Sequence, residues 1–250
     1  MNESVILCEG FHDRAFWDGW LAHLNCSKAR YVPNAPGGQQ KDPWGKPISK
    51  GQYGYDSPTG RFLRVVPCGG KEKVIPEVRF RLKGRTTQSL MRLVLNIDSD
   101  LPAGTAASGL SCHDVLAEVR KFDPMASLLA NDEISMDGGA TLVSLISWEA
   151  SDPSKIGLPD QQSLERLMCA SIVAVYPDRA AAVHGWLSSR PAPPQSGPKD
   201  YSWSDMAGWY AENGCDDFFR HVWRDPAIAA QLRTRLTQTS AWTIAASLAV

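Results

Sequence analysis

Acidic side chains follow two short apolar segments of the sequence, at positions where metal-dependent chemistry is common. Glu9 comes directly after the apolar run 4–8, and Asp98 and Asp100 come directly after the apolar run 90–97. Carboxylate oxygens are hard ligands suited to Mg²⁺ or Mn²⁺, and a carboxylate that does not bind the metal can transfer a proton. We therefore interpret Glu9, Asp98 and Asp100 as catalytic residues and metal ligands of one site. Water-exposed caps of two strand ends are the structural alternative.

Two further acids could join the same site. Asp13 lies four residues after Glu9, and Glu165 lies at the start of an expected helix. Both are candidate metal ligands. An aspartate in the first turn of a helix is also stabilised by the helix dipole without any metal, and a glutamate is ordinary at a helix start.

Apolar periodicity predicts strands and helices that alternate along the first part of the chain. Strands are expected at 4–8, 62–67, 90–97 and 140–148, and helices at 11–24, 72–83 and 111–122. This order is typical of an α/β fold with a mostly parallel sheet flanked by helices. Ligands of such sheets gather at the carboxyl ends of the strands, where the candidate acids would lie.

The last third of the chain has a different character. Helices are expected at 163–175, 178–187, 201–213 and 216–223, and the apolar end 241–250 is expected to dock as a helix or strand. The chain is therefore predicted to comprise a catalytic domain at 1–158 and a helical C-terminal extension at 159–250.

Residues 33–60 are expected to form a long loop without regular structure. This segment holds six glycines and five prolines, together with Lys41, Lys46, Lys50, Trp44, Tyr53 and Tyr55. Both of its ends lead into the expected sheet, so we predict that it covers or borders the site. Its cations and rings would suit a single-stranded or flipped nucleotide. A surface insertion without a role is the alternative.

Charge is distributed unevenly along the chain, although the net charge is only −1. Residues 61–92 carry nine basic side chains against two acidic ones, whereas residues 93–165 carry twelve acidic side chains against three basic ones. A basic patch beside carboxylates suits an enzyme that acts on phosphodiesters, while two solvated faces are the structural alternative. The candidate nucleic-acid-binding residues are Lys71, Lys73, Arg79, Arg81, Lys83 and Arg85.

The composition excludes several classes of protein. No apolar run is long enough to span a bilayer, and the first residues lack the basic and apolar regions of a secretory signal, so a cytoplasmic location is expected. The six cysteines form no CxxC pair, which argues against a zinc cluster or a redox motif.

Three segments resemble the TOPRIM domain of topoisomerases, bacterial primases, maturation nucleases and OLD-type nucleases. They are VILCEGFHDRAFW, VVPCGGKEKV and LVLNIDSD, and the resemblance covers residues 4–150. The resemblance is closer to the nuclease branch. Members of that branch have additional acids around a second metal, and Asp13 and Glu165 could match those acids. The resemblance implies an Mg²⁺- or Mn²⁺-dependent nuclease or phosphodiesterase acting on DNA or RNA. It also implies a role in anti-phage defence, as a homo-oligomer or in a larger complex.

The chain also departs from that family. The 33–60 segment is absent from a minimal TOPRIM core, and no zinc ribbon, ATPase motif or catalytic-tyrosine context accompanies the match. A non-catalytic TOPRIM-like binding or assembly module is therefore one alternative. A phosphomonoesterase that uses the DxD motif is another, although Pro102 stands where haloacid-type phosphatases have Thr or Val.

Overall fold

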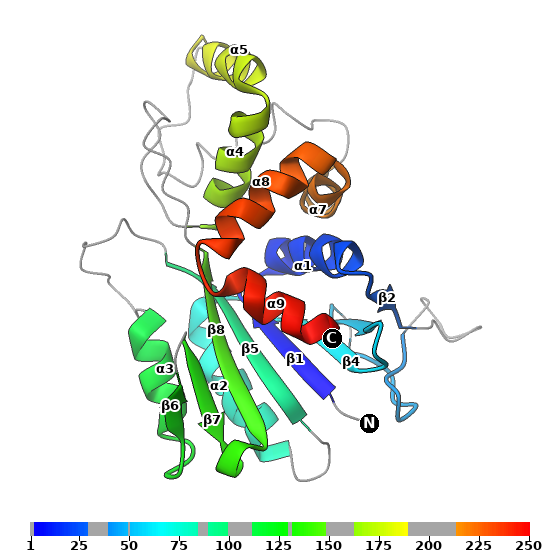
Figure 1. Cartoon of the computed structure of the whole chain (residues 1–250), viewed down its shortest axis with the longest axis vertical. Helices are drawn as coiled ribbons and strands as arrows, with labels where there is room; N and C mark the ends of the chain where they lie inside the picture. Colours follow the sequence, from blue (N-terminus) through cyan, green and yellow to red (C-terminus); the bar gives the residue numbers. More distant parts are fainter. Residues whose placement is uncertain are drawn as a thin grey trace.

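The central feature of the computed structural model is a sheet, which in the described residues has eight strands (Figure 1). The structure describes residues 3–29, 40–49, 51–84, 90–99, 112–129, 132–148, 163–189 and 214–250. Four parallel strands form its centre in the order β4 (Phe62–Pro67), β1 (Glu3–Cys8), β5 (Leu90–Asp98) and β8 (Thr141–Trp148). All four were predicted from the sequence, and they confirm the mostly parallel α/β fold.

Antiparallel strands extend this parallel centre on both sides. Strand β3 (Tyr53–Asp56) pairs with β4, and β2 (Ser27–Lys28) pairs with β3. On the other side β7 (Glu133–Met136) pairs with β8, and β6 (Ser127–Leu129) pairs with β7. The sheet order is therefore β2-β3-β4-β1-β5-β8-β7-β6.

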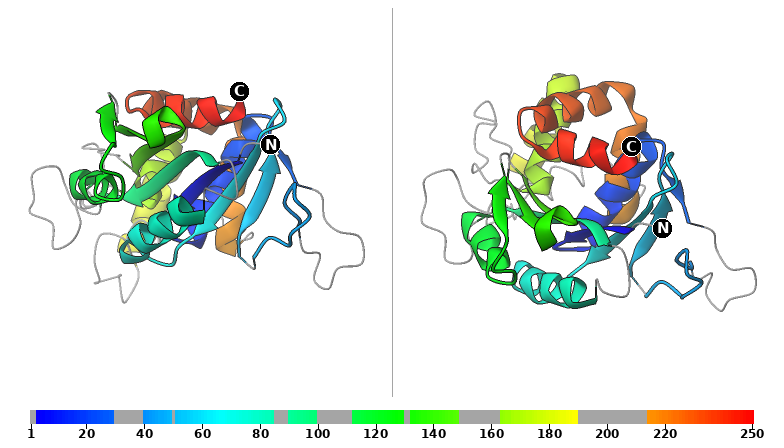
Figure 2. Two further views of the ribbon diagram at one scale, coloured as in Figure 1. Left: turned by 90° about the horizontal axis from the view of Figure 1, so that it is seen from below. Right: turned by 60° about the horizontal axis from the view of Figure 1, so that its bottom comes forward.

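Helices cover both faces of the sheet (Figures 1 and 2). One face carries α1 (Phe11–His23), α4 (Leu164–Val175), α7 (Gly214–His221), α8 (Pro226–Thr237) and α9 (Ala241–Ala249), whose buried side chains form one core with that face. The other face carries α2 (Lys71–Gly84) and α3 (Cys112–Arg120) over a second core. Helix α5 (Pro177–Ser188) continues from the far end of α4, and the 3-10 turns η1 (Asp137–Gly139) and η2 (Val222–Arg224) complete the described elements.

Alternation along the strands divides their side chains between the two cores. Ile6 and Cys8 of β1 enter the core beneath α1, whereas Val5 and Leu7 enter the core beneath α2. Successive side chains of a strand point to opposite faces, and a strand covered on both faces is apolar throughout. The apolar run 4–8 is therefore explained by burial on both sides.

The C-terminal helices contribute to the same core as α1. The indole of Trp20 stacks on that of Trp223, with ring centroids 5.5 Å apart and planes inclined by 11°. Cys8, Cys26, Cys68 and Cys169 are free thiols. None of the helices in the described ranges is both long and apolar enough to cross a bilayer.

The prediction of a structureless loop over 33–60 is wrong for part of that segment. Residues 53–56 form β3, and the turn at 57–60 connects β3 to β4. The buried amide of Gln40 holds this region, because its Nε2 donates to the carbonyls of Ala29 and Gly54 and its Oε1 accepts the Gly54 N–H. Residues 33–39 and Lys50 lie outside the described residues, as does the helix expected at 201–213.

Candidate active site

The candidate site lies where the chain leaves two neighbouring parallel strands in opposite directions. From β1 the chain continues into α1 on one face, and from β5 it continues towards α3 on the other face (Figure 1). Such a point in an open α/β sheet leaves a crevice at the carboxyl ends of the strands. Glu9 follows β1 and Asp98 ends β5, so both predicted acids stand at this point.

Glu9 connects the ends of three strands. Its Oε1 accepts the N–H of Asp98 at 2.8 Å, and its carbonyl accepts the N–H groups of Gly69 and Gly70 at 2.7 and 2.9 Å. Gly69 has a φ of +82°, which is available to glycine at little cost. Because both glycine N–H groups already donate to the Glu9 carbonyl, Gly69 and Gly70 form a tight turn that ties the end of β4 to the end of β1.

Asp13 is held from two directions within the first turn of α1. Its Oδ2 accepts the N–H of Gly10 at 3.0 Å, and its Oδ1 accepts the indole N–H of Trp148 at 2.8 Å. Burial raises the pKa of Asp13 well above its usual range, and the neighbouring carboxylates of Asp98 and Glu165 raise that pKa further. Asp13 therefore keeps its proton to a higher pH than an exposed aspartate.

Asp98 and Glu165 meet at the first turn of α4. Asp98 Oδ1 accepts the N–H of Leu164 at 3.1 Å, and Ser163 caps the helix by accepting the N–H of Arg166. Glu165 is buried, and its Oε2 has no hydrogen-bond partner among the described residues. The structure therefore brings Glu165, which is distant in sequence, into the electrostatic environment of Asp13 and Asp98.

The charges of this acid cluster, defined as Glu9, Asp13, Asp98 and Glu165, are only partly balanced by the helices around it. The N-termini of α1 and α4 both point at the cluster, and each contributes roughly half a positive charge. Four carboxylates against about one positive charge leave an excess of negative charge, before any contribution from Arg166, which is buried in the same turn of α4. Protonation of Asp13 relieves part of this excess, and a divalent cation would relieve more.

The side chains of the acid cluster meet only part of the requirements of a metal-binding site. Among the described side chains, no three His, Cys, Asp or Glu groups are arranged as a ready-made metal site. Glu9, Asp13 and Asp98 each direct an oxygen at an N–H donor of the protein. The buried, unpartnered Oε2 of Glu165 is the oxygen whose environment fits a cation best. Asp100, predicted as a ligand, lies outside the described residues.

The cations predicted to bind nucleic acid lie along α2. Lys71 and Lys73 are in its first turn, next to the Gly69-Gly70 turn that contacts Glu9. Arg79, Arg81 and Lys83 lie in its later turns, and Arg81 pairs with Glu77 at 2.8 Å. Arg85 lies outside the described residues. The structure therefore places the two lysines nearer to the acid cluster than the rest of the basic segment.

The 40–57 region borders the site through α1. Arg14 donates to the carbonyl of Gly51 at 2.8 Å, and its guanidinium lies 4.3 Å from the ring centroid of Tyr53. Phe11, which begins α1, is 56% exposed beside this contact. Tyr55 was expected to offer a stacking surface, but it is buried and donates its hydroxyl to Asp18 at 2.7 Å.

Sequence reasoning missed Trp148 as a member of the site. Its indole is buried at the end of β8 and holds Asp13 from across the sheet. A tryptophan at the end of an expected parallel strand was a usable signal, because a buried indole N–H needs an acceptor. His12, next to the acid cluster in sequence, stacks on Phe219 with ring centroids 5.1 Å apart.

The fold has a counterpart among solved structures. No family model and no curated protein matches this sequence. The crystal structure of a hypothetical protein from Pyrococcus horikoshii OT3 superposes with a TM-score of 0.70 at 14% identity, and the match covers 100% of both chains. At that identity the likeness shows a shared α/β fold, with the helical C-terminal segment included.

Proposed function

We propose that this protein is a divalent-metal-dependent phosphodiester hydrolase that acts on DNA or RNA. The observation that carries the proposal is the convergence of four carboxylates at the switch point of the sheet. They come from the ends of two strands and the first turns of two helices. A stable fold does not need four acids at one place, because neighbouring like charges repel unless a proton or a cation compensates them. The TOPRIM resemblance of the same residues supports the same chemistry.

Each acid has a proposed role that follows from its surroundings. Glu9, Asp98 and Glu165 would hold Mg²⁺ or Mn²⁺, and Glu165 offers its unpartnered oxygen. When bound, the ion would polarise the phosphodiester and lower the pKa of an attacking water. Asp13, whose pKa is raised, keeps a proton that it can give to the leaving oxygen. Lys71 and Lys73 would attract the phosphates to this edge of the sheet.

Cleavage assays on the purified full chain test the proposal. Single- and double-stranded DNA and RNA are each incubated with millimolar Mg²⁺ or Mn²⁺, and with EDTA. We expect metal-dependent cleavage that falls by roughly 100-fold or more in Asp98→Asn and Glu9→Gln. Asp178→Asn is the matched control, because Asp178 is an exposed carboxylate on α5, at the far end of α4 from Glu165. This control should cleave at the wild-type rate.

A binding measurement separates a lost metal site from a lost catalytic step. Mg²⁺ should raise the thermal midpoint of the wild type, because it binds only the folded cluster, and Asp98→Asn should lose much of that gain. Metal-independent cleavage, or equal rates in the wild type and the acid variants, would overturn the proposal. Nucleic-acid binding without cleavage would favour a non-catalytic module, and hydrolysis of phosphomonoesters alone would favour a phosphatase.

A further inference from the structure

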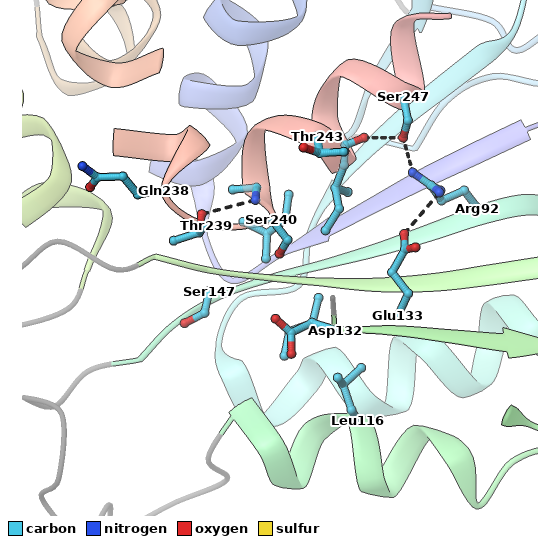
Figure 3. A pocket seen from close by; sticks show the side chains of 14 residues that line it. Arg92, Leu116, Asp132, Glu133, Ser147, Gln238, Thr239, Ser240, Thr243 and Ser247 are labelled. Atoms are coloured by element: carbon cyan, nitrogen blue, oxygen red, sulfur yellow. Dashed lines mark hydrogen bonds and ion pairs between the residues drawn. The ribbon is translucent and has the colours of Figure 1, made fainter. Parts of the chain in front are cut away.

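A cavity of about 630 Å³ lies beside β8 (Figure 3). It is lined by the part of β8 beyond the described pairing with β7: Glu133 of β7 pairs with Ser144, and β8 continues to Trp148. Helix α9 and the turn before it form the opposite wall. The volume is in the range of small-molecule sites, and none of the four acids of the cluster lines it.

The wall formed by α9 carries both hydroxyl groups and apolar side chains. Ser240, Thr243 and Ser247 line the cavity at helical spacing, together with Ala241 and Ile244. Leu116 of α3 and Leu145 of β8 add apolar surface to the lining. The cavity therefore suits a compact molecule that has both hydroxyl groups and an apolar C–H face.

The charged side chains that line the cavity differ in whether they have hydrogen-bond or ion-pair partners. Arg92 of β5 is held between Glu133, at 3.2 Å, and the hydroxyl of Ser247 (Figure 3). Glu133 also accepts the Ser144 hydroxyl at 2.7 Å. Asp132 also lines the cavity, and in the described part of the chain its carboxylate has no hydrogen-bond or ion-pair partner. Among the described lining residues, the unpaired charge is therefore that of Asp132, whose side chain is exposed.

The backbone fixes the position of Asp132. Its φ is +56°, a left-handed conformation that is uncommon outside glycine, and its carbonyl accepts the N–H of Leu145 at 2.9 Å. Aspartate adopts this conformation more readily than most residues, and here the hydrogen bond to Leu145 holds the backbone in place. The unpartnered carboxylate is thus held at the cavity by the edge of β8.

We propose that this cavity is a binding site for a small, hydroxyl-rich molecule that carries one ammonium group, the chemistry of an amino sugar. The ammonium group pairs with Asp132, and the ligand's hydroxyl groups exchange hydrogen bonds with Ser240, Thr243 and the neighbouring polar side chains. Its C–H face packs on Leu116 and Leu145. A phosphate or another anion is disfavoured, because the one arginine of the lining is already paired with Glu133. The site is independent of the proposed hydrolase activity.

Glucosamine and glucose provide a matched pair of probes, since they differ in one ammonium group in place of one hydroxyl group. Binding to the full chain is measured by isothermal titration calorimetry at low salt and mildly acidic pH, where the amine is protonated. We expect glucosamine to bind about 5- to 10-fold more tightly than glucose or N-acetylglucosamine, the range of a charge-assisted hydrogen bond that is partly exposed to water. Added salt should reduce the difference.

Two aspartate variants make the test specific to this cavity. Asp132→Asn should abolish the preference for glucosamine. Asp137→Asn should retain it, because Asp137 has a similar φ of +54° but does not line the cavity. Asparagine tolerates the left-handed conformation, so both variants should fold, and circular dichroism checks this. Equal affinities for the two sugars, no binding of glucosamine, or an unchanged preference in Asp132→Asn would each overturn the proposal.

Discussion

At the scale of single residues, the candidate site places several acidic side chains close together in a buried environment. Asp13 is buried next to Asp98 and Glu165, and it is stabilised by two N–H donors. Those donors lower its pKa, but burial and the neighbouring carboxylates outweigh them, so the net shift is upward. Strongly shifted pKa values of this kind are frequent at functional sites.

The raised pKa of Asp13 predicts how stability depends on pH in the metal-free protein. An aspartate in the unfolded chain has a pKa of about 4, so above that pH the folded state binds more protons than the unfolded state. The free energy of unfolding should therefore fall as pH rises from there to the higher pKa of folded Asp13. The Asp13→Asn variant lacks this titrating carboxyl group, so the free energy of unfolding of the variant should decline less over the same pH range. Urea unfolding at a series of pH values, with EDTA present, measures both curves.

Asp178→Asn serves as the control for this experiment. Asp178 is exposed on α5, so its removal should leave a pH profile parallel to that of the wild type. Parallel profiles for the wild type and Asp13→Asn would show that Asp13 titrates normally, which contradicts the raised pKa.

At the scale of elements, α2 connects the basic segment to the site. Its first turn follows the Gly69-Gly70 turn that contacts Glu9, and its later turns lead away from the carboxyl edge. Arg79 and Lys83 are eight and twelve residues beyond Lys71, which corresponds to roughly 12 to 18 Å along the helix. From the sequence alone, these cations were predicted to form one patch. In the structure they lie along α2, at different distances from the acids.

Salt dependence of nucleic-acid binding should separate the two ends of α2. Each phosphate contact that is lost reduces the slope of log K against log salt by about one unit. We expect Lys71→Gln with Lys73→Gln to flatten the slope by about two units, and Arg79→Gln with Lys83→Gln to flatten it less. Fluorescence anisotropy with a labelled oligonucleotide in metal-free buffer gives the slopes. An unchanged slope in the Lys71 and Lys73 variant would place the nucleic acid away from this end of α2.

At the scale of the whole molecule, the C-terminal helices and the first helix share one core. Gly19 of α1 lies directly beneath α7, where a Cβ atom would come within 2.5 Å of the Arg220 carbonyl oxygen and 2.7 Å of the Trp223 ring. Next to it, Trp20 stacks between Trp17 and Trp223. Since α1 also carries Asp13, this packing fixes the orientation of one acid of the site.

Gly19→Ala should therefore destabilise the protein by about 1 to 3 kcal/mol, the usual cost of overpacking a core. The matched control is Gly185→Ala on α5, where a Cβ atom would meet nothing within 4 Å. Because alanine is the better helix former, this control should gain about 0.5 to 1 kcal/mol. Urea unfolding of both variants measures the difference. Equal stabilities would show that α7 does not pack on α1 as closely as described.

Local patterns were enough to predict the elements that are buried on both faces or along one stripe. The four parallel strands, α1, α2, α3 and α4 fall within a few residues of their predicted ranges. The missed strands β2, β6 and β7 are two to four residues long and lie at or next to the edges of the sheet, where no continuous apolar run is needed. Strand β3 was missed because its glycine and tyrosines resembled the surrounding loop, and only pairing with β4 selects the extended conformation.

The sequence by itself determined the α/β class, the strand ends after which Glu9 and Asp98 stand, and the basic character of α2. These features depend on periodicity and spacing, which are local properties of the chain. Only the tertiary structure decided that Trp148 holds Asp13 from 135 residues away, that Glu165 joins Asp98 at the start of α4, and that a cavity opens beside β8. These contacts arise from the order in which strands pair and the faces on which helices pack, and many chain arrangements satisfy the same local pattern.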